Sequence, residues 1–146
     1  MYKLSKRSFG NLKTCHEDLQ KIFALAIQLT PVDFIITEGH RSIARQNELF
    51  KKGASKIDGY KKLGKHNLSP SMAVDICAYV KGNKKLAFDP AHLAALGGSI
   101  LASATILLSE GEITHQVRWG ANWDMDGEIL TDQRFDDMPH FELRKV

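Results

Sequence analysis

The chain has 146 residues, of which 43% are apolar and 25% are charged. That balance is typical of a globular domain and excludes a disordered or fibrous chain. Its 20 basic and 17 acidic residues give a net charge of +3, which suits an anionic partner without identifying one. We therefore expect one domain over residues 1–146, acting as a monomer.

The first predicted elements are a helix and a strand. Residues 14–30 carry apolar side chains at three- and four-residue steps, which predicts an amphipathic helix. Thr14 followed by Glu17 matches a capping box at its start, and Pro31 ends it. Apolar residues alternate within residues 31–39, which predicts a strand.

The remaining elements alternate between helices and strands. Ser42 is a candidate N-cap and Gly53 a candidate stop for the next helix. The pattern as a whole predicts an α+β fold, with helices packed on a small, mostly antiparallel sheet. We expect a helix at 42–53, a basic loop at 54–71, a strand at 72–80, a helix at 89–109, a short strand and loop within 115–132, and a strand at 140–146.

Residues 91–109 contain no charged side chain, and their length is close to the minimum for crossing a bilayer. The segment also holds His92, two glycines and several hydroxyl side chains, so we interpret it as a small-residue helix in the core. The first twelve residues lack the apolar stretch of a signal peptide. We expect neither membrane insertion nor a signal peptide.

The chain has six histidines, and two of them stand in unusual contexts. His66 ends the basic loop, and His140 begins the last predicted strand. We expect His40 at most to line a cleft. The other three, His16, His92 and His115, are expected to be ordinary surface residues, with His16 in the first helical turn and His115 in a polar turn.

Asp75 lies in an otherwise apolar strand, where an ionised carboxylate is costly unless it is paired or bound to a metal. Asp137 precedes His140 by three residues, and Pro139 between them disfavours a regular strand, so both side chains can face one cleft. Together with His66, this set suits a catalytic zinc ion with an open position for water and a nearby base. The spacing alone is a weak signal, because the HEXXH motif is absent and chance trios of His and Asp are common, and it also fits a capping aspartate and two unrelated surface histidines.

Four motifs in order are more specific than that spacing. They are "TEGHRSIARQNELFKKGAS", "KHNLSPSMAVDI", "VRWGANWDMDGE" and "DMPHFEL". Together they resemble the zinc D-Ala-D-Ala carboxypeptidase/L-alanyl-D-glutamate peptidase family, and among its members the single-domain bacteriophage endolysins. The resemblance extends over nearly the whole chain.

The resemblance implies a site. His66, Asp75 and His140 would bind Zn²⁺, Asp137 would be the general base, and Arg41 would stabilise the oxyanion. It also implies a supporting role for Gln46. The chain departs from the family pattern in two places: Gly64 replaces the usual Ser, and the interval from the first histidine to the aspartate is nine positions instead of seven.

The resemblance also implies a function. It indicates a zinc endopeptidase that cleaves the stem peptide of bacterial peptidoglycan, with the L-Ala–D-Glu bond as the expected target. A D,D-carboxypeptidase acting on D-Ala-D-Ala and a non-catalytic cell-wall-binding module are the alternatives. Such a lysin would be made in the host cytoplasm and reach the wall after a holin opens the membrane. A nucleic-acid-binding domain has only the basic loop in its favour.

The segment "WDMDGE" alternates acidic residues around a glycine, so it is a weak candidate for a regulatory Ca²⁺ site. Its acidic residues are Asp124, Asp126 and Glu128, and the full EF-hand pattern is missing. We expect Trp119 and Trp123 to lie in the core or in a cleft wall.

Overall fold

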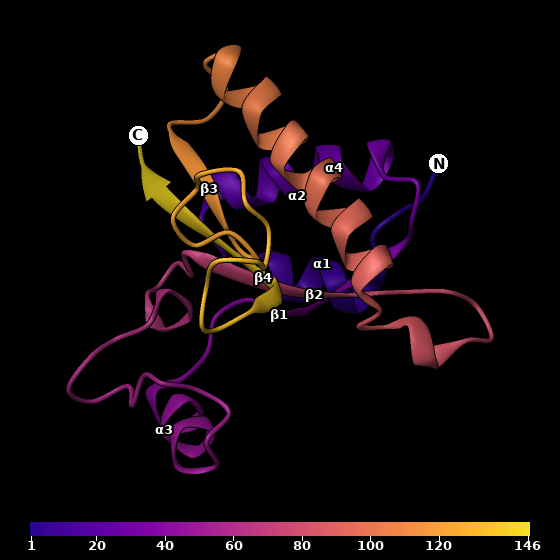
Figure 1. Cartoon of the computed structure of the whole chain (residues 1–146). Coiled ribbons are helices and arrows are strands. Elements are labelled where there is room, and N and C mark those ends of the chain that lie inside the picture. Colours follow the sequence, from indigo (N-terminus) through magenta and orange to yellow (C-terminus); the bar gives the residue numbers. More distant parts are fainter.

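A four-stranded antiparallel sheet with the order β1-β2-β4-β3 forms the centre of the molecule (Figure 1). The computed structural model describes residues 1–146. The predicted α+β architecture is confirmed, with four α-helices and two 3-10 turns around this sheet. The elements are α1 Lys6–Leu12, α2 Glu17–Leu29, β1 Phe34–Glu38, α3 Ile43–Lys51, η1 Lys65–Asn67, β2 Ala73–Ala78, η2 Lys84–Leu86, α4 Pro90–Ser109, β3 His115–Gly120 and β4 Asp137–Lys145.

The two faces of the sheet differ in polarity, because side chains alternate along each strand. Val74 and Ile76 of β2 and Phe141 of β4 belong to one hydrophobic core, together with residues of α2 and α4. Phe23 of α2 packs edge-to-face on Phe141 at a centroid separation of 6.1 Å. Asp75 occupies the alternate position on β2, so its carboxylate lies on the opposite, more polar face.

The N-terminal region departs from the prediction in two ways. A short helix, α1, precedes the predicted one, and α2 begins at Glu17 with His16 as its N-cap. The predicted cap, Thr14, instead donates its hydroxyl to the carbonyl of Asn11 and accepts from the amide of His40. The hydroxyl of Thr14 therefore connects α1 to the segment after β1, and the ring of His16 accepts the free amide of Asp18.

Strand β4 begins earlier than predicted and includes Pro139. Its pairing with β2 ends at His140, and its register with β3 shifts between Trp119 and Gly120. Pro139 therefore lies in an irregular stretch, where its missing amide breaks no ladder hydrogen bond. The irregularity allows Asp137 and His140, three residues apart, to line the same cleft.

Helix α4 is long and apolar enough to cross a membrane by length and composition, but 33% of its most apolar window is buried inside the domain. Its inner side packs on α2 and on the sheet, as expected for a core helix. Gly97 on that side lies directly against the indole of Trp119, where an added Cβ would come within 2.5 Å of the ring. The outer side is uncharged and only partly buried, so the predicted burial holds for one side of the helix.

Replacing this glycine tests the packing of α4. Gly97→Ala should lower the free energy of unfolding by about 1–3 kcal/mol, because the methyl group overpacks the contact with Trp119. The adjacent Gly98→Ala is a matched control, since its Cβ would meet nothing within 4 Å. It should stabilise the helix by about 0.4–1 kcal/mol. Urea unfolding of both variants measures the difference in the free energy of unfolding. Equal stabilities would contradict the close packing of Gly97 against Trp119.

Candidate metal-binding active site

The three predicted ligands meet at one point. Nε2 of His66 and Nδ1 of His140 lie 3.1 Å and 3.0 Å from Oδ1 of Asp75. The candidate ligand atoms of the three residues all lie within 4.8 Å of one another. Both histidines are buried, with 4% and 8% of their surface exposed. We refer to His66, Asp75 and His140 below as the central trio.

Strand register places two members of the trio and a tied loop places the third. Asp75 pairs directly with His140 across β2 and β4. His66 lies on η1, where its carbonyl accepts the amide of Arg41 at 2.8 Å. The loop after His66 returns to the sheet, where the amide of Met72 donates to the carbonyl of Lys65. Residues from three separate segments therefore converge at one point.

Each histidine has one ring nitrogen that faces Asp75 and one that points away from it, called here the outer nitrogen. Each outer nitrogen has a hydrogen-bond partner of its own. Nδ1 of His66 lies 2.7 Å from the carbonyl oxygen of Gly39, and Nε2 of His140 lies 2.9 Å from Oε1 of Glu142. Such partners hold the proton on the outer nitrogen and leave the inner one free to bind a metal. Each of the two imidazole nitrogens lies about 3 Å from the carboxylate oxygen, and all three atoms lie within 4.8 Å of one another, which suits a small tetrahedral coordination sphere. The residues present therefore fit a divalent metal.

Arg41 lies beside the trio and is held by three side chains. Its Nε and Nη2 donate to both carboxylate oxygens of Glu38 at 2.8 Å and 2.6 Å, and Nη2 lies 3.4 Å from Oδ2 of Asp75. Nη1 donates to Oε1 of Gln46 at 3.0 Å. A guanidinium has five N–H donors, so one N–H on Nη1 stays available to a ligand.

Gln46 joins Arg41 to the long loop. This side chain is fully buried, and its Nε2 donates to Oγ of Ser55 and to the carbonyl of Ile57. The predicted supporting role of Gln46 thus has a geometric basis, since one amide holds both the arginine and the loop. At Gly64, where the family pattern has serine, the backbone amide donates to Oδ1 of Asn67.

Asp137 differs from the other carboxylates of the site because no hydrogen bond or ion pair holds it. It lines the same cleft as the trio and is partly buried. Burial raises the pKa of Asp137, and the attraction of His140, His66 and Arg41 only partly offsets that effect. A free carboxyl group with a raised pKa is suited to accepting a proton from a ligand.

These groups open into a cleft of about 640 Å³. One wall comes from α3 and the loop after it, and the other from the polar face of the sheet (Figure 1). Trp123 and Phe135, whose rings stack, close one side, so Trp123 is a wall residue while Trp119 is buried in the core. His40, predicted at most to line the cleft, lies outside it.

The model of the family described as "Phage L-alanyl-D-glutamate peptidase" matches residues 1–144. The chain belongs to this family. The L-alanyl-D-glutamate peptidase of Escherichia phage T5 is 28% identical over 127 residues, covering 87% of this chain and 85% of the relative. The peptidoglycan L-alanyl-D-glutamate endopeptidase CwlK of Bacillus subtilis is 30% identical over 115 residues, covering 77% of this chain and 61% of CwlK.

A solved structure also matches this member of the phage peptidase family. The crystal structure of the Serratia marcescens L-Ala D-Glu endopeptidase ChiX superimposes with a TM-score of 0.72 and 27% sequence identity. The match covers 97% of this chain and 89% of the ChiX chain. The fold and the family suggested by the four motifs are therefore confirmed.

Sequence analysis missed the residues that support His140. Glu142 accepts from His140 and from Nη2 of Arg118, the latter at 2.8 Å. The guanidinium of Arg118 lies 5.3 Å from the ring centroid of Trp123, and its Nε is buried without a partner. The signal was present in "HFE", because residues two apart on a strand share a face. Glu38 was also missed, although it lies only three residues before Arg41.

The acidic residues of two loops have distinct surroundings. Asp136, the neighbour of Asp137, accepts from Gln133 and does not line the cleft, so the cleft contains only Asp137 of the pair. In the loop after β3, the acidic group consists of Asp124, Asp126 and Asp132. The predicted third member, Glu128, bonds to Thr131 instead. Calcium binding by this exposed loop stays a prediction.

Without a metal, the trio should hold a proton. Burial opposes protonation of His140, but the hydrogen bonds to Asp75 and Glu142 outweigh it and raise its pKa from 6.5 to about 9. Burial also acts to raise the pKa of Asp75, yet the two histidines hold it well below its ordinary value. The metal-free site is thus an imidazolium beside a carboxylate.

This proton gives the metal-free protein a defined pH dependence. Because the folded-state pKa of His140 lies above its unfolded value, its contribution to stability is complete below about pH 6.5. That contribution should be lost as the pH rises through about 9. Urea unfolding of chelator-treated protein between these pH values checks the loss. A His140→Gln control should show a flatter profile, and parallel profiles would contradict the assignment.

Proposed function

We propose that this chain is a zinc endopeptidase that hydrolyses the L-Ala–D-Glu bond in peptidoglycan stem peptides. The observation that carries the proposal is the central trio, which lies in an open cleft beside an unpaired carboxylate and a fixed arginine. Membership of the phage L-alanyl-D-glutamate peptidase family, and the names of the T5, CwlK and ChiX relatives, support the choice of bond.

The donor set favours zinc as the metal. His66 and His140 supply two nitrogens and Asp75 one oxygen, a combination found in catalytic zinc sites that keep one position open. When bound, zinc supplies a Lewis acid that makes water acidic enough to lose a proton near neutral pH and that polarises a carbonyl group. Gly39 and Glu142 hold the two imidazoles in the orientation that this role requires.

Asp137 is the proposed general base. Its carboxylate has no competing partner in the cleft, so it is free to take a proton from the attacking water. Its raised pKa makes it a better base than an exposed aspartate and lets it pass the proton to the departing amino group. Asp75 cannot share this task, because both histidines hold its Oδ1 and keep its pKa low.

Arg41 is the proposed oxyanion donor. Glu38 and Gln46 hold the guanidinium in one orientation, so it needs no rearrangement when negative charge develops on the scissile carbonyl oxygen. Its remaining Nη1–H is the donor available for that oxygen. The ion pair with Glu38 is compatible with this role, because it uses Nε and Nη2 and fixes the guanidinium at the edge of the cleft.

The place of action follows from the substrate. Peptidoglycan is anionic, and the net charge of +3 favours association with it. We infer that the enzyme degrades the cell wall during host lysis, and that a holin releases it from the cytoplasm where it is made.

Mass spectrometry of digested peptidoglycan tests the activity and the bond together. Cleavage at L-Ala–D-Glu should yield peptides with a new D-Glu amino terminus and glycan strands that retain L-Ala. Release of free D-Ala would instead indicate a D,D-carboxypeptidase. Binding to the sacculus without any new fragment would indicate a non-catalytic module and refute the proposal.

Asp137→Asn tests the proposed base. The amide cannot take a proton, so kcat should fall by about 10²–10⁴-fold. Zinc content should be unchanged, because Asp137 is not one of the three ligands. Asp136→Asn is the matched control and should keep full activity, since Asp136 lies outside the cleft. Equal activity of Asp137→Asn and wild type would remove Asp137 as the base.

Glu142→Gln tests the support of His140. The substitution keeps the size of the side chain but weakens both the bond to His140 and the ion pair with Arg118. Zinc affinity should fall by about 10–100-fold, as is typical when a partner of a metal-bound histidine is lost. Competition with a chromophoric chelator measures the affinity. Glu48→Gln on the exposed surface of α3 is the control and should bind zinc like wild type.

A further inference from the structure

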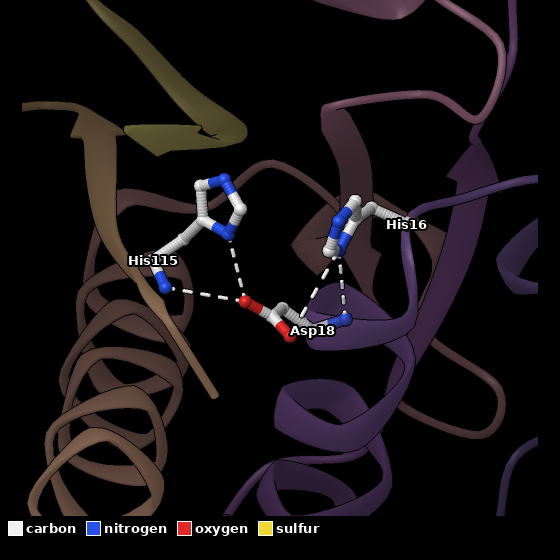
Figure 2. Close-up of side chains that lie close together, drawn as sticks. All are labelled: His16, Asp18 and His115. Atoms are coloured by element: carbon white, nitrogen blue, oxygen red, sulfur yellow. Dashed lines mark hydrogen bonds and ion pairs between the residues drawn. The ribbon is translucent and has the colours of Figure 1, made fainter. Parts of the chain in front are cut away.

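A second group of two histidines and one aspartate lies outside the cleft (Figure 2). His16 and Asp18 stand at the start of α2, and His115 begins β3. Nδ1 of His115 lies 2.8 Å from Oδ2 of Asp18, and Nδ1 of His16 lies 3.9 Å from Oδ1 of Asp18. The candidate ligand atoms of all three lie within 4.8 Å of one another. Both histidines, predicted to be ordinary surface residues, are thus part of one cluster.

Asp18 is a buried carboxylate with no permanent cation beside it. Only 4% of its side chain is exposed, and its ion-pair partners are His16 and His115 alone, with no Lys or Arg. A buried carboxylate is costly unless it is paired or bound to a metal. Burial acts to raise the pKa of Asp18, but hydrogen bonds from His115 and from the amides of Thr114 and His115 lower it below its ordinary value. The group therefore stays ionised at neutral pH.

The two oxygens of this carboxylate have different surroundings. Oδ2 accepts from the amides of Thr114 and His115 and lies against Nδ1 of His115. Oδ1 faces His16 without a hydrogen bond. Figure 2 shows the contacts of His115 that anchor the carboxylate through Oδ2. Because Oδ1 has no hydrogen bond, its lone pairs stay free for a further ligand. The rings of His16 and His115 meet edge-on, with 4.9 Å between their centroids.

We propose that His16, Asp18 and His115 form a second binding site for a divalent transition metal of the zinc class, separate from the central trio. Two imidazoles and a carboxylate favour such metals over calcium or magnesium, which prefer oxygen ligands. A metal there cross-links the start of α2 to the start of β3. Asp18 and His115, which it would join, are 97 residues apart in sequence. The role that follows is structural, since no residue of the cluster lines the cleft.

This second site is weaker than the first for two reasons visible in its geometry. In the central trio the ligand atoms already lie 3.0 Å and 3.1 Å apart, whereas His16 must move closer to Asp18 from 3.9 Å. Nδ1 of His16 also accepts the amide of Asp18 at 3.0 Å and must give up that bond to coordinate. Neither outer nitrogen has a partner like Gly39 or Glu142. We expect an affinity about 10–100-fold or more below that of the first site.

Calorimetric titration of the metal-free full-length protein with Zn²⁺ tests the proposal. Wild type should bind two equivalents in two steps of different affinity. His115→Gln should lose the weaker step and keep the tighter one, because glutamine retains a donor for Asp18 but offers no imidazole. His92→Ala is the matched control: His92 also bonds to an aspartate, Asp89, but no third ligand joins them. This control should still bind two equivalents.

Imidazole nitrogen resonances of the wild type give a reading that does not depend on any variant. Signals of His66 and His140 should shift with the first equivalent, and those of His16 and His115 with the second. Binding of a single equivalent, or a second step that persists in His115→Gln, would overturn the proposal. Either result would mean that the cluster links α2 to β3 by hydrogen bonds alone, without a metal.

Discussion

The antiparallel register of β2 against β4 is the constraint on which both the core and the site depend. It places Asp75 opposite His140 on one face while Val74 and Phe141 pair on the other. A slip of one residue would exchange the faces, burying the carboxylate among apolar side chains and exposing the core residues. The central trio and the hydrophobic core therefore require the same register, because a slip that disrupts one also disrupts the other.

The charges around the central trio explain why the site suits a dication. Its ion-pair network, together with Asp137, holds four carboxylates against two guanidinium groups. These are Glu38, Asp75, Asp137 and Glu142 on the acidic side and Arg41 and Arg118 on the basic side. A bound divalent cation would offset this excess of negative charge. Without a metal, a proton on His140 offsets part of it. Metal and proton thus compete for one negatively charged position.

The cleft depends on polar contacts as much as on the sheet. Gln46 holds Arg41 with its oxygen and the loop after α3 with its nitrogen, so Arg41 and the cleft wall share one buried amide. On the opposite wall, Arg118 is held between Glu142 and Trp123. Both walls are therefore positioned by side chains that also orient residues beside the central trio.

The sequence by itself determined the α+β class, the long helices and most strands, because periodicity and caps such as Ser42 are local signals. The ordered motifs also predicted the central trio, Arg41 and Asp137 as site residues, and the structure places all five around one cleft. Only the tertiary structure decided which side chains support them. Arg118 meets Glu142 across two strands, so that contact has no fixed spacing in sequence. Glu38 lies only three residues before Arg41, but the chain must turn after β1 to bring the two side chains together. The cluster at Asp18 was not predicted because its members lie far apart in sequence. Only the packing of α2 against the start of β3 brings His115 to His16 and Asp18.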